Sequence, residues 1–139
     1  MKLYFDTCCY NRPFDDLSQE RVRQESDAVL SIIARARLCN AGIFGSAALI
    51  GEIVSIQNEE RRNKVALLYR ITTQFVERDE AVVKRAKELQ GKGMHAMDSM
   101  HVALSEKVDA VFLTVDDKLL RICKRLGINA MSPTEYLGR

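Results

Sequence analysis

Residues 110–126, AVFLTVDDKLLRICKRL, decide the fold class of this chain. The run AVFLT is apolar up to its final threonine, which is typical of a strand buried on both faces of a parallel sheet. Asp116 follows soon after this strand, and residues 117–126 have the pattern of a helix. A buried strand that leads directly into a helix is the unit from which parallel α/β sheets are built.

The same alternation of strands and helices continues along the chain. Strands are also expected at residues 2–6, 43–47 and 128–131, with a short strand or apolar turn at Phe75 and Val76. We therefore predict one α/β domain over residues 1–139, with a mainly parallel sheet of about four to five strands flanked by helices. In such sheets the active site lies beyond the carboxyl ends of the strands, near the point where the strand order reverses.

Helices and loops are expected between these strands. The helices are predicted at about residues 16–40, after a possible Ser46 N-cap, at 59–75, from Asp79 or Glu80, at 97–106 and 117–126, and as a turn or helix at 133–137. Residues 7–16 contain one proline and several turn-forming residues, so they are expected to form a loop. Gly42 is expected to provide the left-handed residue that ends the first helix.

Composition places the chain among ordinary globular proteins. It has 139 residues, 47% of them hydrophobic and 29% charged, which is enough to bury a core. No apolar run approaches the ~20 residues of a membrane span. The start, MKLYFD, is too short and too quickly acidic for a signal peptide, so a cytoplasmic protein is expected. The net charge of +2 does not by itself indicate nucleic-acid binding.

The cysteines do not form a pattern that indicates a special role. An adjacent pair and two distant single residues do not match the paired spacing of zinc sites. A disulfide framework is not expected in a cytosolic chain of this size. We interpret the four as small buried or half-buried hydrophobic residues: Cys8, Cys9, Cys39 and Cys123.

Four acidic residues lie where a parallel sheet would bring them together. Asp6 and Asp116 follow strands, and Glu52 and Asp98 lie on adjoining helices. Carboxylates gathered at one edge repel each other, and a divalent cation removes that conflict. An all-oxygen set of ligands suits Mg²⁺ or Mn²⁺ better than zinc. Such ions support metal-assisted hydrolysis, especially of phosphodiesters.

These acids stand in short motifs that resemble a PIN domain, the metal-dependent ribonuclease fold found in VapC-type toxins. The matching segments are Asp6-Thr7 after the first strand, LIGEIV around Glu52, AMDSMHVAL around Asp98 and FLTVDDKLL around Asp116. Their order and spacing match the family over essentially the whole chain. The resemblance implies that Asp6, Glu52, Asp98 and Asp116 bind one or two Mg²⁺ or Mn²⁺ ions. Cleavage of single-stranded RNA would then leave 5′-phosphate and 3′-hydroxyl ends.

Other residues receive supporting roles from the same resemblance. The hydroxyls of Thr7 and Thr114 are expected to support the ligands. Asp117 is expected either to support the site as an outer acid or to cap the following helix. His101 lies one turn after Asp98 and is a candidate general base, although its helix position favours packing or a hydrogen bond to the site.

The segment CCYNRPFDD after Thr7 departs from the more aliphatic stretch of many family toxins. Asn11 and Arg12 are therefore expected at the mouth of the site, where Arg12 could contact a phosphate bidentately. On a later helix, Lys118 and Arg121 share a face that could guide RNA phosphates, or that could simply be solvated.

The resemblance implies a toxin ribonuclease, neutralised by a small antitoxin and paired as a homodimer, with no membrane association. Two alternatives remain open at this point. One is a PIN-like nuclease of RNA processing with no toxin role, which would share the same acids. The other is a non-catalytic module that binds RNA or a protein partner, against which the retention of all four acids argues.

Overall fold

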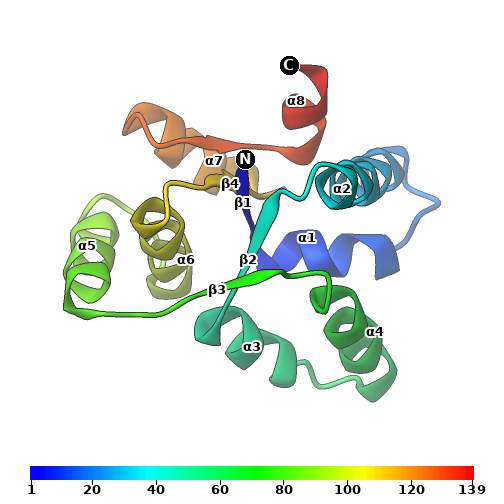
Figure 1. Ribbon diagram of the computed structural model, residues 1–139, viewed down its shortest axis with the longest axis horizontal. Helices are drawn as coiled ribbons and strands as arrows, with labels where there is room; N and C mark the ends of the chain where they lie inside the picture. The colour runs from blue at the N-terminus through cyan, green and yellow to red at the C-terminus, as the bar shows by residue number, and fades with distance from the viewer.

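A five-stranded parallel sheet forms the centre of the computed structural model, which describes residues 1–139 (Figure 1). The strands lie in the order β3-β2-β1-β4-β5, and all neighbours are parallel. Their bounds are β1 Lys2–Phe5, β2 Gly42–Ser46, β3 Gln74–Val76, β4 Val111–Leu113 and β5 Ala130–Met131. The predicted α/β class with a parallel sheet is therefore confirmed.

Helices cover both faces of this sheet. Figure 1 shows α5, α6 and α7 on one side and α1, α2 and α4 on the other. None of the helices combines the length and apolarity that a membrane span requires. Their bounds are α1 Thr7–Asn11, η1 (a 3-10 turn) Arg12–Phe14, α2 Glu20–Leu38, α3 Ala47–Val54, α4 Glu59–Tyr69, α5 Glu80–Gly91, α6 Ala96–Lys107, α7 Asp117–Arg125 and α8 Pro133–Gly138.

The central strand β1 carries the core. Leu3, Tyr4 and Phe5 are completely buried, as are Phe112 and Leu113 of the neighbouring β4. From β1 the chain moves outward to β2 and β3, then crosses back to place β4 on the other side of β1. The strand order therefore reverses between β1 and β4, and ligands of open α/β sheets bind at the carboxyl edge of such a point.

The segment after β1 is helical, so the prediction of a loop over residues 7–16 was wrong. The Asp6 side chain accepts a hydrogen bond from the Thr7 N–H at 2.8 Å and caps α1. A short 3-10 turn with Pro13 near its start follows. An aspartate after a strand is a good N-cap, and here that local bond turns the chain into a helix at once.

Three other features of the helix ends also differ from the prediction. Helix α2 begins at Glu20 rather than near residue 16, because the Asp16 side chain accepts bonds from Ser18 and holds a turn. Its left-handed residue is Asn40, with φ of 52°, while Gly42 begins β2. Helix α4 ends at Tyr69, since Gln74–Val76 pairs with β2 as a strand.

Replacing Gly45 with alanine should destabilise the fold. An added Cβ would lie 2.1 Å from the Tyr69 hydroxyl oxygen, and that hydroxyl accepts a bond from the Ser46 N–H at 3.1 Å. The ring would have to move and lose this bond. We expect the free energy of unfolding, measured by urea denaturation, to fall by about 1–3 kcal/mol.

Gly51 provides the matched control, because a Cβ there meets no atom within 4 Å. It lies inside α3, where alanine has the better helix propensity. Gly51→Ala should therefore leave stability unchanged or raise it by up to about 1 kcal/mol. If Gly45→Ala behaved like Gly51→Ala, the close approach of Tyr69 to β2 would be contradicted.

Candidate active site

Asp6 lies at the carboxyl end of β1 and is only 7% exposed. One carboxylate oxygen accepts from the Thr7 N–H, and the other accepts from the Thr114 hydroxyl at 2.8 Å. The Cys8 thiol lies 3.4 Å from the same second oxygen. Burial raises the pKa of Asp6, although His101 and the Thr114 hydroxyl work in the opposite direction. The fold thus holds a carboxylate in its interior with neutral donors.

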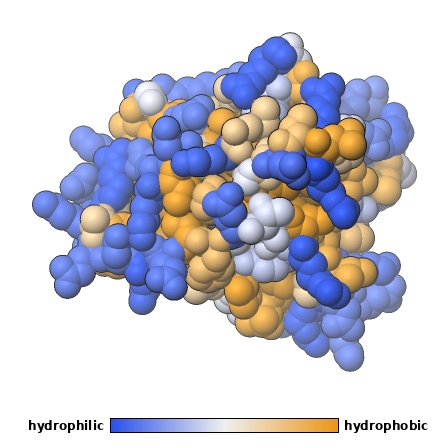
Figure 2. Space-filling view, viewed as in Figure 1, coloured by the Kyte–Doolittle hydropathy of each residue, from blue (hydrophilic) through white to orange (hydrophobic).

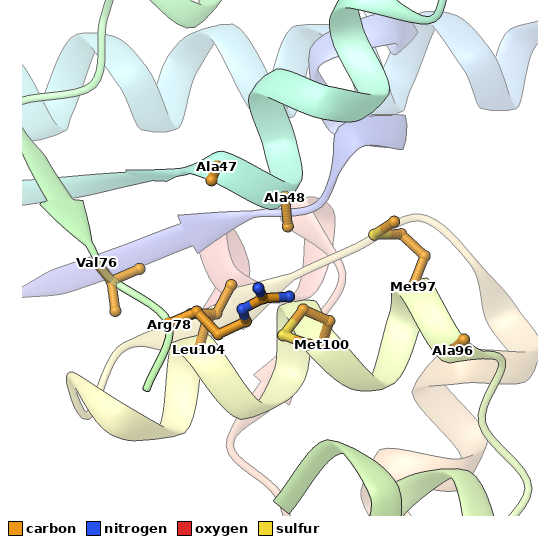
Figure 3. Close-up of a pocket in the computed structure, with 8 residues that line it drawn as sticks. All are labelled: Ala47, Ala48, Val76, Arg78, Ala96, Met97, Met100 and Leu104. Atoms are coloured by element: carbon orange, nitrogen blue, oxygen red, sulfur yellow. The ribbon is translucent and has the colours of Figure 1, made fainter. Parts of the chain in front are cut away.

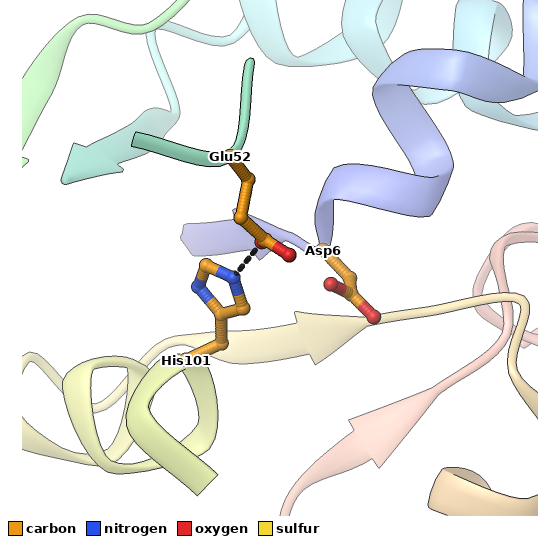
Figure 4. A group of neighbouring side chains, drawn as sticks. All are labelled: Asp6, Glu52 and His101. Atoms are coloured by element: carbon orange, nitrogen blue, oxygen red, sulfur yellow. Dashed lines mark hydrogen bonds and ion pairs between the residues drawn. The ribbon is translucent and has the colours of Figure 1, made fainter. Parts of the chain in front are cut away.

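Glu52 reaches the same place from the second turn of α3, and Figure 4 shows its carboxylate next to that of Asp6. The Thr7 hydroxyl and His101 Nε2 both bond to one of its oxygens, Oε1. Partial burial works to raise the pKa of Glu52, but these two hydrogen bonds outweigh it and lower the pKa overall. Glu52 is therefore a carboxylate near neutral pH.

His101 completes a compact group with these two acids. Asp6, Glu52 and His101 each offer one possible metal-ligand atom, and these three atoms lie within 4.8 Å of one another. The ring is completely buried, and both of its nitrogens have partners: Nε2 meets Glu52, and Nδ1 meets the Tyr4 hydroxyl at 2.6 Å. Packing and a hydrogen bond to a site carboxylate are thus its observed contacts, as its position on the helix suggested.

Asp98 and Asp116 stand further out at the same edge. Asp98 lies in the first turn of α6, half-buried, and makes neither a hydrogen bond nor an ion pair with the protein. Burial, together with the charges of Asp6 and Asp116, raises the pKa of Asp98. Asp116 is exposed and caps α7 through the Leu119 N–H at 3.1 Å. The four acids therefore share one electrostatic neighbourhood.

This arrangement fits a divalent cation. Asp6, Asp98 and Asp116 form no ion pair with any lysine or arginine, although most other acids near the site do. Mutually repelling carboxylates without a cationic side chain leave negative charge uncompensated. Carboxylate oxygens are the ligands that Mg²⁺ and Mn²⁺ prefer.

The two predicted hydroxyls and Asp117 can now be placed. Thr7 donates to Glu52, and Thr114 donates to Asp6, so both touch the acids that they were expected to support. Asp117 instead turns to Arg21, with a distance of 2.7 Å between Oδ1 and Nη2. It does not cap α7, because Asp116 already does.

Of the four residues predicted to contact RNA, two are bound within the fold and two are free on the surface. Arg12 pairs with Asp15 at 3.2 Å and lies 3.5 Å from the buried Glu25. Asn11 donates to the Thr7 carbonyl and accepts from Arg61. Both side chains are therefore engaged within the fold. The remaining two candidates are exposed on α7 and have no ion pair: Lys118 and Arg121.

Sequence reasoning missed three residues that touch the site or its neighbours: Tyr4, Ser46 and Cys8. Tyr4 is buried in β1, and its hydroxyl contacts both His101 and Ser46. A tyrosine in the middle of a buried strand is the available signal, since its hydroxyl needs a polar partner in the interior. Cys8 is one of four free cysteines, and its thiol also lies 3.3 Å from the Thr114 hydroxyl.

An apolar hollow of about 420 Å³ lies beside this site, between α3, the end of β3 and α6 (Figure 3). Figure 2 shows several apolar patches, separated by hydrophilic side chains, on the face of the molecule that Figure 1 presents. Met97 and Met100 of the hollow flank Asp98 on α6, and Arg78 is its single charged residue. The hollow has no acidic lining, so the candidate chemistry lies next to it and not inside it.

Comparison with known proteins gives a consistent result. The sequence model of the family described as PIN domain matches residues 4–125. Among solved structures, VapBC2 from Rickettsia felis bound to a promoter DNA fragment includes a chain with a TM-score of 0.68 at 13% identity, covering 95% of this chain and 98% of that one. FitAcB from Neisseria gonorrhoeae gives 0.60 at 16%, covering 96% and 98%. VapBC-1 from nontypeable Haemophilus influenzae gives 0.61 at 17%, covering 96% and 99%. No curated protein matches by sequence.

Asp98→Asn should stabilise the metal-free protein near pH 7. A carboxyl group whose pKa is raised on folding contributes stability only at low pH, and this is lost as the pH rises through the raised pKa. At pH 7 the charged Asp98 therefore opposes folding. We expect the free energy of unfolding to rise by up to about 1 kcal/mol in the variant, with a smaller gain as the pH falls towards 3.8, the ordinary value.

Asp117→Asn is the control of opposite sign. Arg21 lowers the pKa of Asp117, so its charge favours folding at pH 7 and the substitution should bring no gain. Urea unfolding between pH 7 and about pH 4.5 tests both variants in the presence of EDTA. A loss of stability in Asp98→Asn at pH 7 would contradict the inferred repulsion.

Proposed function

Because the chain belongs to the PIN domain family, we propose that it is a metal-dependent endoribonuclease that cleaves single-stranded RNA. The observation that carries this proposal is the compact group of Asp6, Glu52 and His101 at the carboxyl end of β1, with Asp98 and Asp116 near enough for the charges of Asp6 and Asp116 to raise the pKa of Asp98. Asp6, Asp98 and Asp116 form no ion pair with a lysine or arginine. Charge of this density is costly without a bound cation.

These four acids would hold Mg²⁺ or Mn²⁺. When bound, such an ion acts as a Lewis acid on a phosphodiester and lowers the pKa of a water molecule. Thr114 and Thr7 would keep Asp6 and Glu52 in place through the hydrogen bonds described above. The products would carry 5′-phosphate and 3′-hydroxyl ends.

The RNA backbone would be guided by cations near the acids. Lys118 and Arg121 lie on α7, whose N-cap is Asp116, and both are exposed without an ion pair. They are the candidates that need no rearrangement. Arg12 and Asn11 would first have to give up their contacts with Asp15, Glu25 and Arg61, so we place them second.

We propose further that the protein is the toxin of a type II toxin–antitoxin pair in the cytoplasm. The similar folds above come from VapBC and FitAB complexes, and this supports a small antitoxin as partner. A homodimer is proposed because the resemblance to VapC-type toxins implies one. A PIN-like nuclease of RNA processing would have the same acids, so the partner decides between the two.

Cleavage of a mixed pool of single-stranded RNA tests the nuclease. Purified protein should cut the pool with Mg²⁺ or Mn²⁺ and not with EDTA. Asp6→Asn and Asp98→Asn should each lower the rate by about 100-fold or more, because each removes a charge that would hold the ion. The 5′ ends of the products can be read by ligation.

The neighbours Asp116 and Asp117 give a matched pair for the same assay. Asp116→Asn keeps the helix cap, since asparagine caps as well as aspartate, but it should lose most activity. Asp117→Asn should retain it, because that side chain binds Arg21. Cutting that survives the Asp6 and Asp98 substitutions would contradict the site. No cutting with any metal, with the fold intact, would favour a binding module.

The toxin role predicts a partner and an assembly. A short open reading frame beside the gene should encode a protein that co-purifies with the chain and suppresses RNA cleavage. Light scattering of the chain alone should give the mass of a dimer. A monomer that its host tolerates without any partner would instead favour the RNA-processing role.

A further inference from the structure

A closed hydrogen-bond ring, buried except at Glu52, begins and ends on helix α3. The Leu49 N–H donates to the Ser46 hydroxyl oxygen at 3.1 Å, and Ser46 lies 2.7 Å from the Tyr4 hydroxyl. Tyr4 lies 2.6 Å from His101 Nδ1, and His101 Nε2 bonds to Glu52. The N-cap of α3 and the Glu52 carboxylate on its second turn are thus joined through β1 and α6.

The direction of the bonds in this ring follows from its chemistry. An ionised carboxylate only accepts, so Nε2–H of His101 is the donor to Glu52. In a neutral imidazole the other nitrogen, Nδ1, then accepts from the Tyr4 hydroxyl, and the Tyr4 oxygen accepts from the Ser46 hydroxyl. Both hydroxyls and both imidazole nitrogens of this hydrogen-bond ring have a partner in this arrangement. Tyr4, Ser46 and His101 are all completely buried, so water does not compete for the bonds among these three residues.

Helix α3 needs such an anchor. Only Leu49 and Ile53 of its eight residues are buried, and Ile50 and Val54 are exposed. Glutamate also has a long side chain, which loses rotamer entropy when it is fixed. Without the ring, the Glu52 carboxylate would be held by the Thr7 hydroxyl alone.

The ring also leaves one Glu52 oxygen available. Thr7 and His101 both bond to Oε1, and Oε2 has no partner in the protein. His101 itself has no free nitrogen, because Nε2 meets Glu52 and Nδ1 meets Tyr4. Glu52 is therefore held through Oε1 by the hydrogen-bond ring, while Oε2 stays available to face a cation.

We propose that His101, fixed by Tyr4, is a positioning residue that holds Glu52 with Oε2 free to bind the divalent cation. This inference rests on the proposed function, because it assumes that Glu52 is a ligand. Hydrogen-bond partners of metal ligands typically change metal affinity by roughly 10- to 100-fold when they are removed.

The test is the affinity for Mn²⁺, measured by calorimetry on the whole protein, with cleavage of single-stranded RNA beside it. His101→Leu should weaken Mn²⁺ binding by about 10- to 100-fold. His101→Gln, whose amide can still donate to Glu52, should retain most of the affinity. Tyr4→Phe keeps the ring that packs near Phe112 and removes only the hydroxyl, so it should weaken binding by less, about 3- to 10-fold.

Saturation separates positioning from loss of a ligand. High Mn²⁺ should restore the cleavage rate of Tyr4→Phe and His101→Leu towards that of the unmodified protein, because the ligand is still present. It should not restore Glu52→Gln. Electron spin-echo spectra of bound Mn²⁺ should show no directly coordinated nitrogen. A nitrogen ligand in those spectra would overturn the proposal and make His101 a ligand.

Ser105→Ala is the matched control for a purely structural role. Ser105 is a buried polar residue of α6, the helix that carries His101. Its hydroxyl donates to the carbonyl of Ala110 at 3.1 Å, and Ala110 belongs to a different part of the fold. It should lower stability to urea and leave Mn²⁺ affinity unchanged. If Tyr4→Phe and His101→Leu did the same, the positioning role would be refuted while the nuclease stood. If the unmodified protein bound no Mn²⁺ and cut no RNA, the proposed function itself would fall, and this inference with it.

Discussion

The burial of a carboxylate at the end of the central strand is the constraint on which the rest of this structure depends. Asp6 is 7% exposed and has no lysine or arginine beside it. An anion in such a place costs several kcal/mol unless donors or a cation compensate it. The donors come from α1 and from the residues after β4, so both segments must lie close to the end of β1. The short pairing of β1 with β4 makes this possible.

A second buried system supports the acid from α3. The Glu52 carboxylate on α3 bonds to Thr7, the first residue of α1, and to His101 of α6, so three helices meet there. Hydroxyl groups and a histidine hold the acids in place through hydrogen bonds, and no arginine or lysine balances the charge of the acids. Arginines near the site are bound to other acids, such as Arg12 to Glu25 and Arg21 to Asp117. The negative charge at the site is therefore not balanced by an arginine or lysine.

Much of this could be predicted from local pattern, and the rest depended on distant partners. The run AVFLT and the helix after it are recognisable because burial on both faces leaves a continuous apolar strand. Helix α1 was not predicted, because its sequence TCCYN has no helical spacing of apolar residues. A distant residue, Arg61 of α4, also holds its end by donating to the Asn11 carbonyl. The partner of Arg12, Glu25, could not be chosen among many acids. Tyr4 received no role from the sequence, because its hydrogen bond to His101 spans 97 residues.

The strand order has a consequence for how the protein is made. Strand β1 is synthesised first, yet its neighbour β4 is not complete until residue 113 has been added. Contacts between segments so far apart form late, because the loop between them must close first. Until then the end of β1 lacks Thr114, and the acids cannot gather. In a chain whose proposed substrate is RNA, the acids at the end of β1 thus come together only after Thr114 has been synthesised and β4 has paired with β1.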